Sequence, residues 1–246
     1  MTKRTLVGAL VAALLLLLAA VPLHAAQQDF KLAVDGVGSV SAPLQIVIVL
    51  TLLSFLPAVL VIMTSFTRIV IVFHFLRQAM GTQEMPPNQV LVGLTLFLTV
   101  FVMAPVADRI NEQAIQPAIA GKVSVGDAIL LATPPLRDFM LKQTRQKDLA
   151  LFVELSGGPR PSQPSDLSMR VVVPAYAISE LKTGFQMGFF VFVPFLLIDL
   201  VVSTTLLSMG MMQLPPAMIS LPFKLLLFVM VDGWNLIVSS LVRSFA

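Results

Sequence analysis

Two apolar stretches decide the fold of this chain: FQMGFFVFVPFLLIDLVVSTTLL at residues 185–207 and AMISLPFKLLLFVMVDGWNLIVS at residues 217–239. Each is long enough to cross a bilayer as a helix, since a span needs about 20 predominantly apolar residues. Between them lies SMGMMQLPP at residues 208–216, where a glycine follows the first helix and a proline opens the next. The pattern predicts a helical hairpin with a methionine-rich turn.

A second hairpin is predicted nearer the N-terminus. Leu44 to Met63 is apolar and contains Pro57, which predicts a kink, and another span runs from Val90 to Val106. The amphipathic stretch from Arg68 to Arg77 is expected to continue the helix past the membrane face. Basic residues outnumber acidic ones in this connecting loop, so the loop is predicted to be cytoplasmic.

The turns of the two hairpins share a short pattern. Residues 80–87 read MGTQEMPP and residues 209–216 read MGMMQLPP, so both have Met-Gly, four residues and then Pro-Pro. Glycine and proline are ordinary punctuation at helix ends, and so short a match can arise by chance. The contrast between a polar turn and a methionine-filled turn nevertheless needs a physical reason.

The composition is that of a membrane protein. The chain is 57% hydrophobic and only 12% charged, whereas a soluble domain carries about 25% charged residues. The net charge of +3 comes from scattered basic residues, which argues against a nucleic-acid partner. There is no cysteine, and this excludes disulfides, thiolate nucleophiles and cysteine metal sites.

The N-terminal region is predicted to be a targeting segment. Lys3 and Arg4 precede an apolar run and an acceptable cleavage site after Ala25, so residues 1–25 are interpreted as a signal peptide. The alternative is a retained first span. Residues 26–43 are expected to form a flexible periplasmic lead-in, and lipid is an expected partner of the apolar segments that follow.

A polar insert separates the two hairpins. Residues 107–182 hold nine of the 16 basic and eight of the 13 acidic residues. The predicted architecture is all-α: a first hairpin at 44–106, a mostly helical periplasmic insert at 107–170, and a second hairpin at 171–246. The fold class is therefore an all-α membrane protein, with two kinked helical hairpins flanking an extracytoplasmic insert.

Catalysis is not expected. The chain has two histidines, His24 in the predicted signal peptide and His74 on an amphipathic stretch without a carboxylate at ligand spacing. No nucleophile elbow, zinc-binding histidine pair or phosphate-cradling loop is present. The sequence predicts no enzyme, no cofactor and no metal site.

Charges inside the apolar segments are the stronger functional signal. Asp199 and Lys224 lie at equal distances from the turn, so an antiparallel hairpin places them at the same depth. A charge at a helix centre costs about 2.5–3.5 kcal/mol on insertion scales, so each must face protein or a water-filled cavity. The two either pair across the hairpin or line an aqueous path. Glu180 and Arg145 are further candidates for pairing between helices or subunits.

The methionine turn allows two interpretations. Met209, Met211 and Met212 can simply pack, because methionine fills irregular gaps. If several copies met at an axis, the same turns would form a flexible apolar ring, and a hydrophobic constriction can gate a conduit by dewetting.

Several long motifs resemble the FliP family of flagellar export proteins. They are PAYAISELKTGFQMG at 174–188, LPPA at 214–217 leading to LPFK at 221–224 and VDGW at 231–234, TSFTRIV at 64–70, and PPNQVL at 86–91. They occur in order and cover nearly all of the chain from about Leu44 onward.

The resemblance implies a subunit of the type III export gate in the flagellar basal body of the bacterial inner membrane. It implies a ring of copies, a pentamer, together with FliQ, FliR, FlhB and FlhA, through which unfolded flagellar subunits pass. Its methionine gasket corresponds here to Met211 and Met212, with Met209 adjacent, while Gln213 replaces a third consecutive methionine and is expected to weaken the seal. The family also implies that the hairpins need not span lipid individually. The alternatives are an injectisome gate subunit or, more remotely, a small-solute channel or transporter.

Overall fold

The computed structural model describes residues 42–82, 85–157, 163, 166–211 and 213–246. The signal peptide predicted for 1–25 and nearly all of the lead-in predicted for 26–43 lie outside the described residues. The chain divides into two units, residues 1–45 and 46–246. The packing and contacts described below belong to the second unit.

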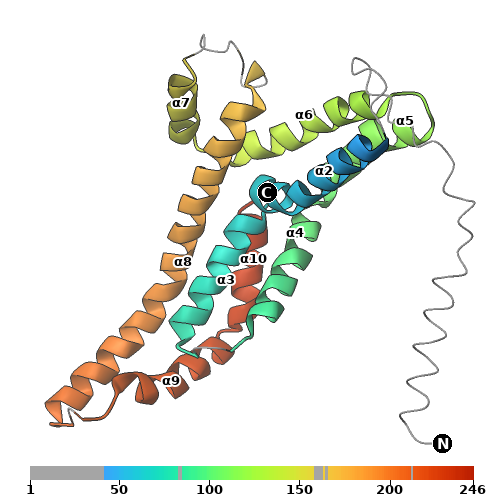
Figure 1. The fold of residues 1–246 in the computed structure, drawn as a ribbon. Coiled ribbons are helices and arrows are strands. Elements are labelled where there is room, and N and C mark those ends of the chain that lie inside the picture. Colours follow the sequence, from blue (N-terminus) through green and yellow to red (C-terminus); the bar gives the residue numbers. More distant parts are fainter. Residues whose placement is uncertain (1–41, 83–84, 158–162, 164–165, 212) are drawn as a thin grey trace, which may run out of the picture. The chain divides into compact units, whose positions relative to one another are not determined.

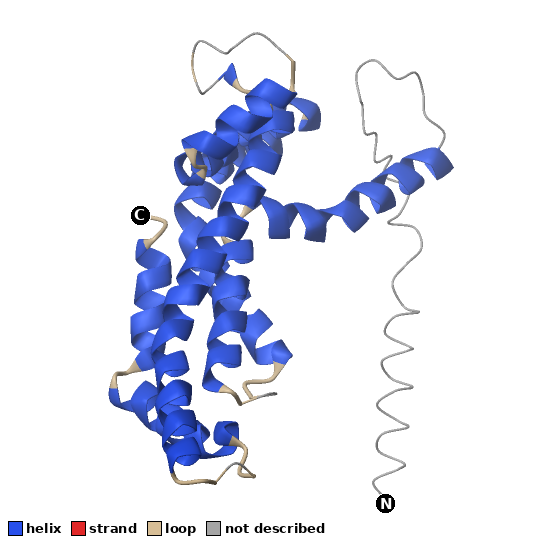
Figure 2. Cartoon of the chain, turned by 90° about the vertical axis from the view of Figure 1, so that its left-hand side faces the viewer, coloured by secondary structure: helices blue, strands red, loops and turns tan. Residues whose placement is uncertain are grey.

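Every regular element among the described residues is a helix, and this confirms the all-α fold class (Figure 2). In chain order the helices are α2 (Ala42–Met63), α3 (Phe66–Met80), α4 (Asn88–Ile110), the π-helix η2 (Asn111–Ile115), α5 (Gln116–Ile119), α6 (Val125–Gln143), α7 (Gln146–Leu155), α8 (Met169–Ser208), α9 (Pro216–Met230) and α10 (Gly233–Arg243).

Among the described residues, two helices are long and apolar enough to cross a membrane. They are the continuous helix Asn88–Ile119, which joins α4, η2 and α5, and Met169–Ser208, which is α8. Two bent pairs raise the number to four if each pair counts as one span: Pro57–Met63 of α2 with α3, and α9 with α10. These lengths and compositions confirm a membrane protein.

The helices α3 and α8 make the most extensive helix–helix contact in the described part of the chain. Two glycines of α8 lie against α3: a Cβ on Gly184 would stand 3.2 Å from the side chain of Ile71, and one on Gly188 would stand 2.6 Å from the Phe75 ring. The absent side chains allow the close approach, as small residues do at interfaces between membrane helices.

Two buried apolar clusters include residues of α8. The first joins α3, α4, α8, α9 and α10 around Phe73 and Leu76, and the second joins α4, α6 and α8 around Met140 and Tyr176. The turn after α3 and the turn after α8 lie at one end of the α3–α8 pair, and the insert helices α6 and α7 lie at the other (Figure 1).

The last apolar stretch is not one helix. The sequence predicted a continuous segment over 217–239, but α9 ends at Met230, α10 begins at Gly233, and the two are bent by 63°. Asp232 at the junction has φ 50°, in the left-handed region. Apolarity determines which environment a segment prefers, and it says little about backbone continuity.

Two other boundaries differ from expectation for the same reason. The helix expected to continue from Met63 into the amphipathic stretch is interrupted at Thr64 and Ser65. The span expected to end at Val106 remains helical to Ile119, through the charged start of the insert. A change in composition marks where a helix leaves an apolar environment. It does not mark the end of the helix, because the backbone hydrogen bonds can continue into a polar environment.

Candidate functional site

The first ion pair joins the two arms of the second hairpin. The Lys224 ammonium of α9 donates to Asp199 Oδ2 of α8 at 2.6 Å. Ser220 Oγ, one turn before Lys224, donates to the other carboxylate oxygen at 2.6 Å. The two charges expected at the same depth are therefore in direct contact, and both oxygens of Asp199 are occupied. The role of this pair in assembly stays a prediction.

Lys224 also reaches the first hairpin. Its ammonium donates to the backbone carbonyl of Ala79 at 3.1 Å, in the last turn of α3. The final carbonyls of a helix lack intrahelical donors, and the helix dipole favours a cation there. Lys224 is only 6% exposed. This buried cation therefore caps the C-terminal end of α3 and also neutralises Asp199.

A second ion pair lies near the other end of α3. Arg68, in the first turn of α3, donates Nε to Glu180 Oε2 at 2.9 Å, and its Nη2 contacts the other carboxylate oxygen. Arg68 is 2% exposed and Glu180 is fully buried. Breaking such a pair leaves an uncompensated buried charge, which is strongly destabilising. The partner of Glu180 is thus on α3, and the pairing joins α3 to α8.

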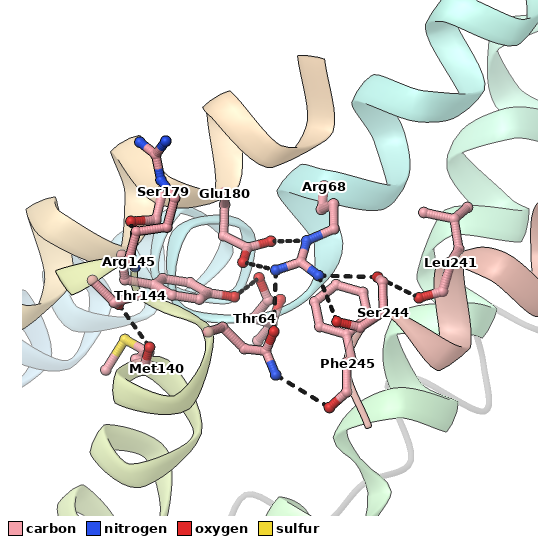
Figure 3. A network of polar contacts seen from close by, with 12 residues as sticks. Thr64, Arg68, Met140, Thr144, Arg145, Ser179, Glu180, Leu241, Ser244 and Phe245 are labelled. Atoms are coloured by element: carbon pink, nitrogen blue, oxygen red, sulfur yellow. Dashed lines mark hydrogen bonds and ion pairs between the residues drawn. The ribbon is translucent and has the colours of Figure 1, made fainter. Parts of the chain in front are cut away.

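Arg145 has a local partner. Its guanidinium binds the carboxylate of Asp148, three residues further on, with Nε at 2.8 Å. Ser179 of α8 links this corner of the insert to the helix pair, because its hydroxyl donates to Asp148 at 2.6 Å and accepts from the Arg145 backbone N–H at 3.1 Å. Figure 3 shows Arg145 and Ser179 beside the Glu180–Arg68 contact.

The environment of Asp148 alters its titration. Burial of the carboxyl raises its pKa, but the hydrogen bonds from Ser179 and Arg145 and the charge of Arg145 outweigh burial. The net effect is a pKa below the ordinary aspartate value. A carboxylate that accepts such bonds is held in its charged form.

The methionine turn lies between α8 and α9. Met209 is 61% exposed and Met211 is 40% exposed, while Met212 lies outside the described residues. Gly210, with φ 74°, supplies the left-handed residue that ends α8. Apolar side chains thus stand exposed at a turn, a position that usually carries polar residues.

Four of the side chains in these contacts were not predicted from the sequence. Arg68 was placed on an amphipathic stretch without a pairing partner, and Asp148, Ser179 and Ser220 were not singled out. Arg68 is 112 positions from Glu180, so local spacing contains no signal for the pair. Asp148 was detectable in principle, since an acid three residues after a basic residue at a helix start is a favourable arrangement. In the described part of the chain no group of three or more His, Cys, Asp or Glu is arranged to hold a metal.

Comparison with known proteins identifies relatives along most of the chain. The sequence profile described as "FliP family" matches residues 49–241. The "Flagellar biosynthetic protein FliP" of Bacillus subtilis is 55% identical over 84% of this chain and 94% of its own length. Proteins of the same name from Pectobacterium carotovorum and Aquifex aeolicus are 54% and 46% identical, covering 86% and 85% of this chain and 82% and 89% of their own lengths.

Proposed function

From the premise that this chain belongs to the FliP family and is a membrane-embedded component of the flagellar export apparatus, we propose that it forms part of the export pore. In this proposal, copies of the chain assemble into a ring, a pentamer, in the inner membrane at the flagellar basal body. FliQ, FliR, FlhB and FlhA are its partners, and unfolded flagellar subunits pass through it.

The observation that carries this proposal is the exposure of apolar side chains at the α8–α9 turn. Met209, Met211 and Leu214 are 61%, 40% and 44% exposed. Exposed apolar groups at such a place call for a partner surface, and symmetric copies meeting at an axis supply one. A ring of thioether side chains can close a conduit by dewetting and deform around a passing chain.

The ion pairs have a supporting role. Lys224–Asp199 and Arg68–Glu180 lie within one chain and connect α3 to α8 and α9. We assign them to holding the hairpins in register, so that the turn is presented at a defined position. Arg145, through Asp148 and Ser179, holds the insert on α8 in the same way.

The relatives favour the flagellar alternative over an injectisome gate, because the three compared above are named as flagellar biosynthetic proteins. A small-solute transporter would need a substrate site near the membrane midplane. Lys224 and Ser220 occupy both oxygens of Asp199, and this arrangement favours a structural pair over a binding site.

The gasket is tested by exchanging its methionines. Met211→Ala combined with Met212→Ala is expected to raise ion and small-molecule leakage through assembled gates, because the constriction becomes wider and less apolar. Gln213→Met is expected to lower leakage. Met230→Ala is the control, since Met230 is 76% exposed at the far end of α9. Leakage that is unchanged in the double variant would reject the gasket.

A further inference from the structure

Arg68 uses every hydrogen-bond donor that it has. A guanidinium carries five N–H groups in a fixed planar fork. Nε donates to Glu180 Oε2, Nη2 contacts Glu180 Oε1 and donates to Gln143 Oε1 at 3.2 Å, and Nη1 donates to the Ser244 backbone oxygen and to Ser244 Oγ, both at 3.0 Å. Figure 3 shows the guanidinium between Glu180 on one side and Ser244 on the other.

Glu180 alone neutralises the charge of Arg68. The remaining three bonds go to neutral acceptors outside α3 and α8. These acceptors belong to Gln143 at the end of α6 and to Ser244 after α10. Because a lysine has three donors and no planar fork, it could not serve the same set. Arg68 therefore does two things at this site: it neutralises Glu180, and it binds specific acceptors on two other segments.

Phe245, the residue after Ser244, makes three further contacts. The Arg68 guanidinium carbon lies 3.9 Å from the centre of the Phe245 ring, close enough for a cation–π contact. The same ring stacks on Phe139 of α6, with centroids 6.3 Å apart and planes at 21°. Gln143 Nε2 donates to the Phe245 backbone oxygen at 3.1 Å.

We propose that residues 244–245 are an intramolecular docking segment, bound in a site formed by Arg68, Gln143 and Phe139, with Glu180 binding the Arg68 guanidinium from the other side. The site takes two backbone carbonyls, one hydroxyl and one aromatic ring. When it is occupied, it fastens α6 of the insert and the end of α10 to the α3–α8 pair.

Docking at this site explains how the bent α9–α10 arm keeps its position. Lys224 of α9 binds the carbonyl of Ala79 in the last turn of α3, and Ser244 binds Arg68 in the first turn of the same helix. The arm is therefore attached to both ends of α3, and its bend at Asp232 lies between the two attachments. This conclusion rests on contacts within one chain and is independent of the proposed pore.

The test is a double-mutant cycle on the full-length chain in membranes or detergent, read by hydrogen exchange. Phe245→Ala and Arg68→Lys are each expected to speed exchange about tenfold in peptides from the C-terminal half of α6 and from α10. This is the size expected for losing a cation–π contact or one hydrogen bond to a charged group. The double variant should exceed the larger single effect only slightly, because both changes empty one site. Peptides from α9 should be unchanged.

Matched controls separate docking from general loosening. Phe190→Ala removes the same side chain from a 74% exposed position on α8, and Arg243→Lys makes the arginine-to-lysine change at an exposed position next to the segment. Both should leave α6 and α10 protected. If Arg68→Lys prevents folding, Phe245→Ala and Phe245→Leu continue the test, because they leave the ion pair intact.

The docking segment would be ruled out by either of two results. The first is that α6 stays protected in Phe245→Ala, and the second is that the two single effects add in full. Leakage of the assembled gate, measured on the same variants, reports on the proposed pore separately, so the two proposals can fail independently.

Discussion

At the scale of single residues, the two buried cations Lys224 and Arg68 each bind acceptors on several segments of the chain. Lys224 links a carboxylate on α8 to a helix-end carbonyl on α3, and Arg68 links a carboxylate on α8 to acceptors on α6 and after α10. Each cation thus connects at least three segments. Removing the partner of such a cation costs more than removing the pair, since a buried charge without compensation remains.

The Asp199–Lys224 pair can be tested by this asymmetry. Asp199→Ala is expected to lower stability by about 1–3 kcal/mol, because it takes the counter-charge and one hydrogen bond from the nearly buried Lys224 ammonium. Adding Lys224→Met should restore much of the loss. The measurement is thermal unfolding of the full-length protein in detergent, with motility as a second readout. Asp138→Ala, at an exposed acid on α6, is the control, and a double variant as unstable as Asp199→Ala would contradict the expectation.

Asp148 predicts a pH dependence for the attachment of α7. Its pKa is lowered in the folded protein, so its contribution to stability is complete above the ordinary aspartate value of about 3.9 and is lost as the pH falls below that value toward the lowered pKa. Hydrogen exchange in residues 146–155, corrected for intrinsic pH effects, should show α7 loosening only in that acid range. In Asp148→Asn the acid-dependent step should disappear. A step of equal size in that variant would assign it to another group.

At the scale of elements, the close contact between α3 and α8 depends on two positions of α8 that have no side chain. Gly184 and Gly188 lie one turn apart and face Ile71 and Phe75. Phe75 also packs edge-on against Phe185, with ring centroids 5.3 Å apart. The Phe75 ring therefore lies between Gly188 and Phe185.

Adding a single methyl group at Gly188 is expected to weaken the packing of α8 against α3. Gly188→Ala places a Cβ 2.6 Å from the Phe75 ring, and overpacking of this kind costs about 1–3 kcal/mol. Gly93→Ala in α4 is the matched control, because nothing lies within 4 Å of its added Cβ, and it should gain about 0.5–1 kcal/mol from helix propensity. Thermal unfolding of both variants measures the difference. Equal stability would mean that α3 and α8 adjust without cost.

At the scale of the whole chain, the described residues expose far more apolar surface than a soluble monomer would. On α4 alone, Phe97, Val100 and Phe101 are 81%, 72% and 66% exposed. Soluble proteins rarely leave contiguous patches of this kind uncovered. Lipid or neighbouring subunits must therefore cover them, in agreement with the length and apolarity of the helices.

Two equally exposed positions on one continuous helix should respond differently to a charge. Phe97→Asp lies in the apolar part of Asn88–Ile119, where an aspartate costs about 2.5–3.5 kcal/mol at a helix centre. Ile119→Asp lies at the end of this helix, beyond Asp108 and Glu112, and is 77% exposed. Membrane-integrated protein resistant to alkaline extraction should fall for Phe97→Asp and stay near wild type for Ile119→Asp. Equal extraction would place both positions in the same environment.

Local sequence determined the class of this protein and the equal depth of Asp199 and Lys224. Apolar length, turn residues and equal distance from a turn can be read from neighbouring positions. In a helical hairpin, two residues at equal distances from the turn lie at the same depth in the membrane. Tertiary structure decided the break at Asp232, the partner of Glu180 and the binding of residues 244–245 by Arg68. The last two depend on segments more than 100 positions apart, which meet because α8 packs on α3 and because a buried guanidinium must satisfy all of its donors.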